Sequence, residues 1–169
     1  FDYLFSQINN NFLQKEKKNI IIALFDTTVS TNYIKFFYQS FLNIINKNNN
    51  IKLAIKTKRY KNLINGLIKN SLSKELHNRI IFYDSAPCFI GKNADLSVCL
   101  GINTAGVEIA LSGSQSVIYW IQKNYLTCNQ FISQKNLVFN NIEEITEKIM
   151  LNNFKSNDYG NHKNIINDI

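Results

Sequence analysis

Continuous apolar runs alternate along this chain with segments whose apolar residues recur every three or four positions. Residues 19–25 form the first run, which is rich in isoleucine and typical of a strand buried on both faces of a parallel sheet. Residues 31–46 follow a Ser30/Thr31 cap candidate and carry apolar residues at helical spacing: Ile34, Phe37, Phe41 and Ile45. The pattern therefore predicts a buried strand followed by an amphipathic helix.

The same alternation continues toward the end of the chain. Further strands are expected at residues 51–56, 79–83, 96–100, 116–120 and 137–139, and helices at 60–78, 88–93, 105–112 and 142–152. The helix over 60–78 is expected to break near Ser71 or Ser73, and Gly113 is expected to end the helix before it. Strand and helix in alternation predict an α/β fold, a three-layer Rossmann-like domain with a mainly parallel sheet of about five or six strands.

Length and composition fit one domain covering residues 1–169, since 45% of the residues are hydrophobic. Residues 1–17 are expected to form an amphipathic helix or lead-in, and residues 155–161 an exposed loop.

The chain starts without Met and ends without a closing signal, so we expect it to be part of a longer protein. We find no bilayer-length apolar run and no signal peptide, and three cysteines without a Cys-x-x-Cys pair suit a reducing, cytoplasmic compartment.

The formal net charge of +7 is compatible with anionic partners: nucleotide diphosphates, acidic lipid surfaces or nucleic acid. Lysines are scattered among many Asn and Ile residues, and only residues 56–59 concentrate the charge. No nucleic-acid motif has that form, so nucleic acid is not an expected partner. The two histidines have no second ligand type around them, and no metal site is expected.

Residues 94–113 carry the most specific pattern in the chain. An apolar run ends there in small, turn-prone residues, which open a helix bearing one carboxylate a turn from its start. Open α/β sheets hold ligands where such a strand ends, and the first amides of the helix can bind an anion because they lack intrahelical partners. This segment is the leading candidate for a nucleotide site.

The order of elements over residues 18–153 resembles the C-terminal, donor-binding half of GT-B glycosyltransferases. Among these it is most similar to bacterial surface-polysaccharide transferases with sialyltransferase-like or capsule-synthesis-like domains. The resemblance rests on residues 25–28, 55–59, 85–87, 94–98, 103–110 and 117–119. Nucleotide-sugar epimerases share this architecture, so the resemblance identifies the fold better than the reaction.

A nucleotide-sugar donor is the ligand that the resemblance implies. Five small residues would let the backbone approach its diphosphate: Gly101, Asn103, Thr104, Ala105 and Gly106. The Thr104 hydroxyl would donate to phosphate oxygens, and Glu108 would accept from the ribose hydroxyls. The alternative is that Thr104 only caps the helix and Glu108 is a solvated carboxylate.

Two further loops are expected at the same edge of the sheet. Lys56, Lys58 and Arg59 would neutralise the leaving diphosphate, although a charge run at a strand end is often only a solvated loop. The second loop, with Asp84, Ser85 and Pro87, would frame the base or form only a turn. The loop over residues 101–106 is expected beside the loop over residues 56–59.

A complete set of catalytic residues cannot be named from this sequence, because a GT-B site lies between two domains. We expect a second, N-terminal domain to hold the glycan acceptor and supply the general base. No Asp-x-Asp motif is present, so we expect a hexosyl or sialyl transfer that is independent of metal and needs no cofactor. Peripheral contact with a membrane is a further option. The alternatives are an epimerase-like or hydrolase-like domain, a non-catalytic nucleotide-binding or partner-binding module and, less well supported, a flavodoxin-like regulatory domain.

Overall fold

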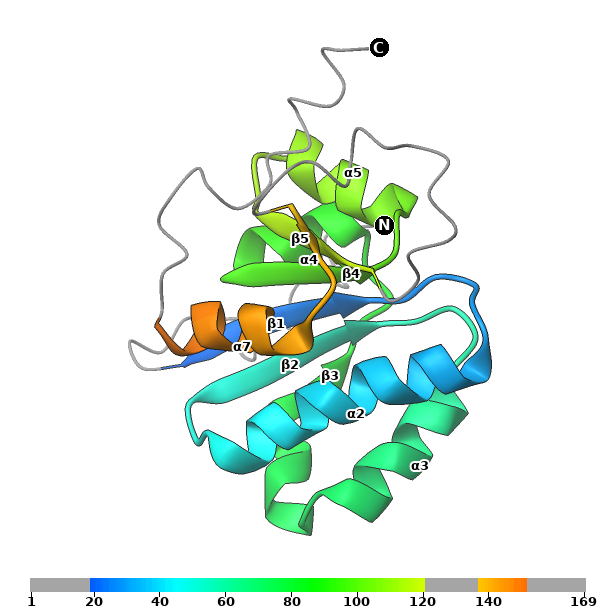
Figure 1. Ribbon diagram of the computed structural model, residues 1–169, viewed down its shortest axis with the longest axis vertical. Coiled ribbons are helices and arrows are strands. Elements are labelled where there is room, and N and C mark those ends of the chain that lie inside the picture. The colour runs from blue at the N-terminus through cyan, green and yellow to red at the C-terminus, as the bar shows by residue number, and fades with distance from the viewer. Residues whose placement is uncertain (1–18, 121–136, 152–169) are drawn as a thin grey trace.

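The computed structural model describes residues 19–120 and 137–151, and within them it confirms the predicted α/β fold (Figure 1). The expectations for residues 1–17 and 155–161 lie outside the described residues. Six parallel strands form one sheet in the order β3-β2-β1-β4-β5-β6. These strands are β1 (Ile20–Phe25), β2 (Ile51–Lys56), β3 (Ile80–Phe82), β4 (Leu96–Leu100), β5 (Ser116–Tyr119) and β6 (Val138–Phe139).

Helices cover both faces of the sheet. The described helices are α2 (Thr31–Lys47), α3 (Lys61–Ser71), α4 (Pro87–Asn93), α5 (Thr104–Leu111) and α7 (Ile142–Met150), with a 3₁₀ helix at Lys74–Arg79. Helices α2, α3 and α7 pack on one face, and α4 and α5 pack on the other (Figure 1).

Strand β1 lies between β2 and β4, and all six of its residues are buried. Because successive side chains of a strand point to opposite faces, Ile22 and Leu24 join the core under α2, whereas Ala23 and Phe25 join the core under α4 and α5. Burial on both faces explains why β1 reads as a continuous apolar run and not as an alternating one.

Most element boundaries differ from the sequence predictions by one or two residues, and the segment from α3 to α4 shows the physical reasons. The helix expected over residues 60–78 ends at Ser71, and the 3₁₀ helix continues the segment, so the predicted break is confirmed. Strand β3 covers only Ile80–Phe82, because the 3₁₀ helix ends at Arg79 just before it. Helix α4 starts at Pro87, one residue early, since the fixed φ of proline suits the first helical position.

Helices α4 and α5 pack closely because Gly91 has no side chain. A Cβ atom at Gly91 would lie 2.7 Å from the Cγ2 atom of Ile109 on α5, closer than real Cβ contacts come. Gly91 is buried, and Ile109 is fully buried. This contact holds α4 against α5, whose residues Thr104, Ala105, Gly106 and Glu108 belong to the predicted site.

Candidate functional site

The strand order reverses between β1 and β4. From β1 the chain builds β2 and β3 on one side, and from β4 it builds β5 and β6 on the other. The loops that follow β1 and β4 therefore lead away from each other and leave a crevice at the carboxyl ends of the strands. In open α/β sheets, this point of reversal is where ligands bind.

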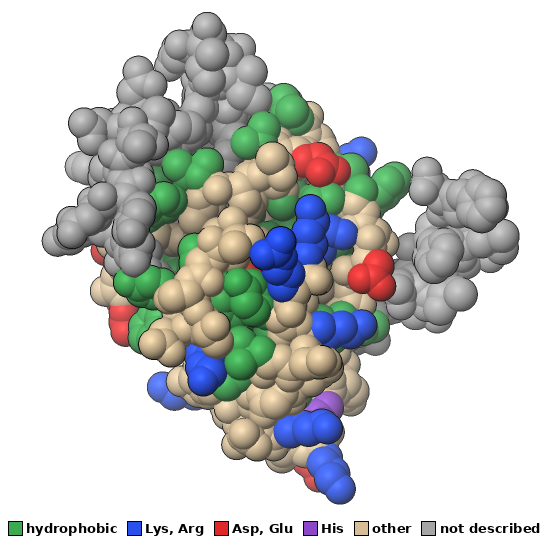
Figure 2. Space-filling view, turned by 90° about the vertical axis from the view of Figure 1, so that its right-hand side faces the viewer, with side chains coloured by type: hydrophobic (Ala, Val, Ile, Leu, Met, Phe, Trp, Pro, Cys, Tyr) green, Lys and Arg blue, Asp and Glu red, His purple; other side chains and the backbone are tan. Residues whose placement is uncertain are grey.

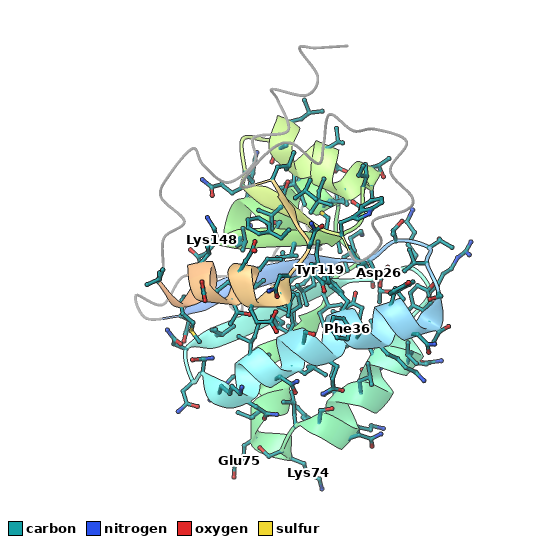
Figure 3. All side chains as sticks on the ribbon, in the orientation of Figure 1. Asp26, Phe36, Lys74, Glu75, Tyr119 and Lys148 are labelled. Carbon is teal, nitrogen blue, oxygen red and sulfur yellow. The ribbon has the colours of Figure 1, made fainter. Side chains whose placement is uncertain are left out.

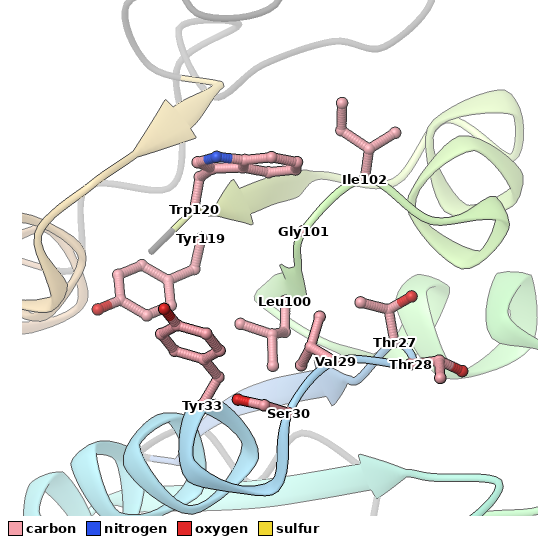
Figure 4. A pocket seen from close by; sticks show the side chains of 10 residues that line it. All are labelled: Thr27, Thr28, Val29, Ser30, Tyr33, Leu100, Gly101, Ile102, Tyr119 and Trp120. Carbon is pink, nitrogen blue, oxygen red and sulfur yellow. The ribbon is translucent and has the colours of Figure 1, made fainter. Parts of the chain in front are cut away.

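A pocket of about 480 Å³ lies at this reversal (Figure 4). Its walls come from the loop after β1, the first turn of α2, the end of β4 and the end of β5. The lining residues are Thr27, Thr28, Val29, Ser30, Tyr33, Leu100, Gly101, Ile102, Tyr119 and Trp120. Of the residues that the sequence predicts for the site, Gly101 alone lines this pocket.

Gly101 ends β4 with a φ of 71°, a left-handed conformation that glycine adopts without steric cost. A Cβ atom there would lie 3.5 Å from Thr27 Cγ2 and 3.6 Å from Trp120 Cζ3, so the residue sits between two walls of the pocket. Helix α5 starts three residues later, and the loop between them turns the chain out of the sheet. The predicted glycine thus has a defined structural role at the pocket.

Asn103 caps helix α5. Its Oδ1 atom accepts a hydrogen bond from the Gly106 amide at 2.9 Å. The alternative that Thr104 caps this helix is therefore wrong, and the reason is that Asn103 holds the extended backbone conformation of an N-cap residue. The Gly106 amide is occupied by this cap, whereas the amides of Thr104 and Ala105 stand in the first turn, where no intrahelical acceptor exists. Thr104 itself is exposed.

Glu108 lies one turn along α5 and points to the start of α4. Its Oε1 atom accepts a hydrogen bond from the Cys88 amide at 3.5 Å, next to Pro87. The side chain is half-buried and not fully solvated. The carboxylate lies beside the first amides of α4, where the positive end of a helix dipole favours a negative charge. The structure therefore places a fixed acceptor group between α4 and α5.

Lys56 holds the loop after β3 in place. Its Nζ atom donates to the backbone carbonyls of Asp84 at 3.1 Å and Ser85 at 2.6 Å. These bonds use two of the three ammonium donors. Lys58 and Arg59 follow Lys56 in the loop after β2, and their side chains are exposed. Figure 2 shows Lys and Arg side chains gathered near the middle of one face of the molecule.

The loop over residues 56–59 and the loop over residues 101–106 are at the same edge of the sheet, as expected, but β1 lies between their strands. Asp26, at the end of β1, occupies that intervening position (Figure 3). Its Oδ2 atom accepts a hydrogen bond from the buried Tyr38 hydroxyl at 2.9 Å, and Thr57 also bonds its carboxylate. Burial raises the pKa of Asp26 above its ordinary value, while these two hydrogen bonds act in the opposite direction.

Tyr119 joins the pocket to the core. Its ring stacks on Phe37 of α2 with ring centroids 6.0 Å apart and planes 18° apart. Burial raises the pKa of Tyr119, and the nearby Glu143 carboxylate adds to that effect. The hydroxyl of Tyr119 therefore stays protonated near neutral pH and can donate or accept a hydrogen bond.

Most residues of the pocket lie outside the site that the sequence predicts. Residues 27–30, Tyr33, Tyr119 and Trp120 were not among the predicted site residues, although residues 25–28 and 117–119 supported the family resemblance. Their relevance depends on β4 pairing with β1 and on β5 pairing with β4. Only the strand order of the sheet brings these residues together, and no local sequence pattern fixes that order.

The described residues hold no group of three His, Cys, Asp or Glu side chains that could bind a metal ion. Within residues 19–120 and 137–151, no helix is both long enough and apolar enough to cross a membrane. Independence from metal and contact with a membrane surface stay predictions.

The sequence matches no protein-family model and no curated protein. Solved structures share its fold. The C-terminal domain of a glycosyl transferase group 1 family protein (LpcC) from Francisella tularensis has 14% identity and a TM-score of 0.60, covering 96% of this chain and 92% of that chain. The C-terminal CMP-Kdo binding domain of WaaA from Acinetobacter baumannii has 10% identity and a TM-score of 0.58, covering 87% of this chain and 86% of that chain.

A third structure, assigned as a UDP-N-acetylglucosamine 2-epimerase from Listeria monocytogenes, has 12% identity and a TM-score of 0.61. It covers 89% of this chain, which spans only 43% of the epimerase. Identities this low show the fold alone. That fold is the one of C-terminal domains of GT-B glycosyltransferases, as the sequence resemblance predicts, and it also occurs in the epimerase.

Proposed function

We propose that this chain is the nucleotide-sugar donor-binding domain of a glycosyltransferase that makes bacterial surface polysaccharide. The observation that carries this proposal is the position of the pocket. It lies at the reversal between β1 and β4, and its residues Gly101 and Ile102 lead directly into the first turn of α5. A diphosphate bound at the Thr104 and Ala105 amides would therefore lie at the mouth of the pocket.

The surrounding residues have chemistry that suits the other parts of a nucleotide. Glu108 offers a half-buried carboxylate oxygen for ribose hydroxyls, and the loop containing Asp84, Ser85 and Pro87 would frame the base. Lys58 and Arg59 are exposed cations that would neutralise the leaving diphosphate. Lys56 serves the same site indirectly, because it fixes the backbone of the loop after β3.

The proposal includes a partner domain that holds the glycan acceptor and supplies the general base. Transfer of a hexosyl or sialyl unit would need no metal or other cofactor, because charge on the leaving diphosphate is stabilised by amides and cations. The enzyme would work in the cytoplasm, and its basic face would favour peripheral contact with anionic lipid at the inner face of the membrane. Nucleic acid is not a proposed partner.

Isothermal titration calorimetry of the 169-residue chain with nucleoside mono- and diphosphates tests this function. Saturable binding of a uridine or cytidine nucleotide is expected. The whole panel failing to bind would refute the donor-binding role and leave a non-catalytic module.

The epimerase with the same fold supports a second candidate, a nucleotide-sugar epimerase-like domain. Both candidates bind nucleotide sugars, so binding cannot separate them. An activity assay of the full-length protein separates them. An epimerase converts the sugar of its nucleotide sugar without any acceptor, whereas a transferase releases the nucleotide as the acceptor is glycosylated.

A further inference from the structure

The walls of the pocket combine aromatic rings with hydroxyl groups. Tyr33 on α2 and Trp120 after β5 lie on opposite sides, and the apolar side chains of Val29 and Leu100 lie between them (Figure 4). Three further residues that line the space, Thr27, Thr28 and Ser30, carry hydroxyl groups. A pocket of this volume and mixed character is typical of small-molecule sites.

None of the ten described residues that line the pocket is acidic or basic. Placing a carboxylate among these residues costs free energy, because the charge loses water and gains no cation from any of the ten. An uncharged group that carries both apolar C–H surface and hydroxyls does not pay this cost of removing a charge from water. Its C–H face can pack against an aromatic ring, while its hydroxyls exchange hydrogen bonds with Tyr, Thr and Ser side chains.

We infer that this pocket holds the sugar unit of the donor, and that this unit is an uncharged pyranose and not a carboxylated sugar such as a sialic or ulosonic acid. The inference rests on the proposed function. If the diphosphate lies at the first turn of α5, a sugar attached to it enters the pocket past Gly101, where the backbone carries no side chain. Trp120, whose ring lies 3.6 Å from the position of a Gly101 Cβ atom, then contacts the sugar at the entrance.

Trp120 also provides the measurement, because it is the only tryptophan in the sequence. We compare matched pairs by titration calorimetry and intrinsic fluorescence: UDP with UDP-glucose and UDP-N-acetylglucosamine, GDP with GDP-mannose, and CMP with CMP-sialic acid. For the pair whose base the chain accepts, the uncharged sugar should tighten binding about tenfold over the nucleotide alone. The sugar should also shift Trp120 emission and protect it from iodide quenching, whereas the nucleotide alone should do neither.

Substitution then separates the sugar contact from the nucleotide contact. Trp120→Leu should abolish the gain from the sugar and leave affinity for the nucleotide alone unchanged. Phe36→Leu is the matched control, since Phe36 is a 52% exposed aromatic residue on α2 that is not among the pocket residues, and it should keep the gain (Figure 3). Tyr33→Phe removes one wall hydroxyl with little change in shape, and a partial loss is expected even if Trp120→Leu folds poorly.

Binding of nucleotides with no gain from any uncharged sugar would overturn the inference and leave the proposed function standing. A gain from the sialic acid unit that exceeds the gain from every uncharged sugar would overturn it as well. If no nucleotide binds at all, the proposed function fails, and the inference fails with it.

Discussion

The Tyr38 hydroxyl donates a hydrogen bond to the Asp26 carboxylate across 2.9 Å, and this contact ties α2 to the end of β1. Tyr38 is fully buried, and burial together with the Asp26 charge raises its pKa well above the ordinary value of 10.0. The tyrosine is therefore a permanent donor near neutral pH. The carboxylate it faces lies between the two loops that the sequence assigns to phosphate binding, so the charge of Asp26 bears on both stability and ligand binding.

Asp26→Asn should change how stability depends on pH. Burial raises the pKa of Asp26 above its ordinary 3.8, so the stability that its protonated form contributes is complete below that pH and is lost as pH rises through the folded-state pKa. Because Asn does not ionise, the free energy of unfolding of the variant relative to the wild type should increase over this window. Urea unfolding at a series of pH values measures it. A difference between the variant and the wild type that stays constant across this pH range would contradict the prediction.

Asn103→Ala should lower the free energy of unfolding by about 1 kcal/mol, because it removes the side chain that caps α5. Thr104→Val changes the neighbouring exposed residue, which has no capping role, and should stay within about 0.5 kcal/mol of the wild type. Chemical unfolding of both variants gives the comparison. Equal losses in the two variants would contradict the assignment of the cap.

The strands and helices were predictable because their signals are local. The apolar run at residues 19–25 reflects burial of β1 on both of its faces. The helical spacing of apolar residues after Thr31 reflects burial of α2 on one face. The cap of α5 was harder, since Asn103 and Thr104 both have side chains that can cap, and only the backbone conformation chooses between them. Trp120 and Tyr33 line the same pocket because of strand pairing and helix packing over long sequence separations, which no local pattern encodes.

Substitution of Lys56 should affect mainly stability, whereas substitution of Lys58 should affect mainly nucleotide affinity. Lys56→Met removes the donor to the Asp84 and Ser85 carbonyls, and it should lower the free energy of unfolding by about 1 kcal/mol. Lys58→Ala should leave stability nearly unchanged and weaken binding of a nucleoside diphosphate by about 1–3 kcal/mol. Thermal unfolding and calorimetry measure the two effects. If Lys58→Ala binds like the wild type, the exposed cations of this loop are only solvated.

Glu108→Gln should discriminate between ribose and its deoxygenated form. A charged acceptor forms stronger hydrogen bonds with ribose hydroxyls than a neutral acceptor does, so the variant should lose affinity for a ribonucleotide. It should lose little for the counterpart whose sugar lacks both hydroxyls. Thr104→Val provides the contrast, because a lost phosphate donor weakens binding of both nucleotides to a similar extent. Equal losses for both nucleotides in Glu108→Gln would show that the carboxylate does not contact ribose.

Gly91→Ala should disturb the packing that sets Glu108 against α4. The new Cβ atom would lie 2.7 Å from Ile109 Cγ2, so the Ile109 side chain must shift, and we expect α4 and α5 to separate, at a cost of about 1–3 kcal/mol in the free energy of unfolding. Gly66→Ala is the control, because a Cβ atom there has no neighbour within 4 Å, and it should stabilise α3 by about 0.5–1 kcal/mol.

A double-mutant cycle identifies the contact responsible. In an Ile109→Ala background the two Cγ atoms that a Cβ at Gly91 would meet are gone, and Gly91→Ala should cost much less there than in the wild type. The same separation should draw the Cys88 amide away from Glu108 Oε1, a bond already at 3.5 Å. Gly91→Ala should therefore also weaken binding of a ribonucleotide, and Ile109→Ala should partly restore it. If the cost of Gly91→Ala is the same in both backgrounds, the clash with Ile109 is not its cause, and Glu108 is positioned by something other than this packing.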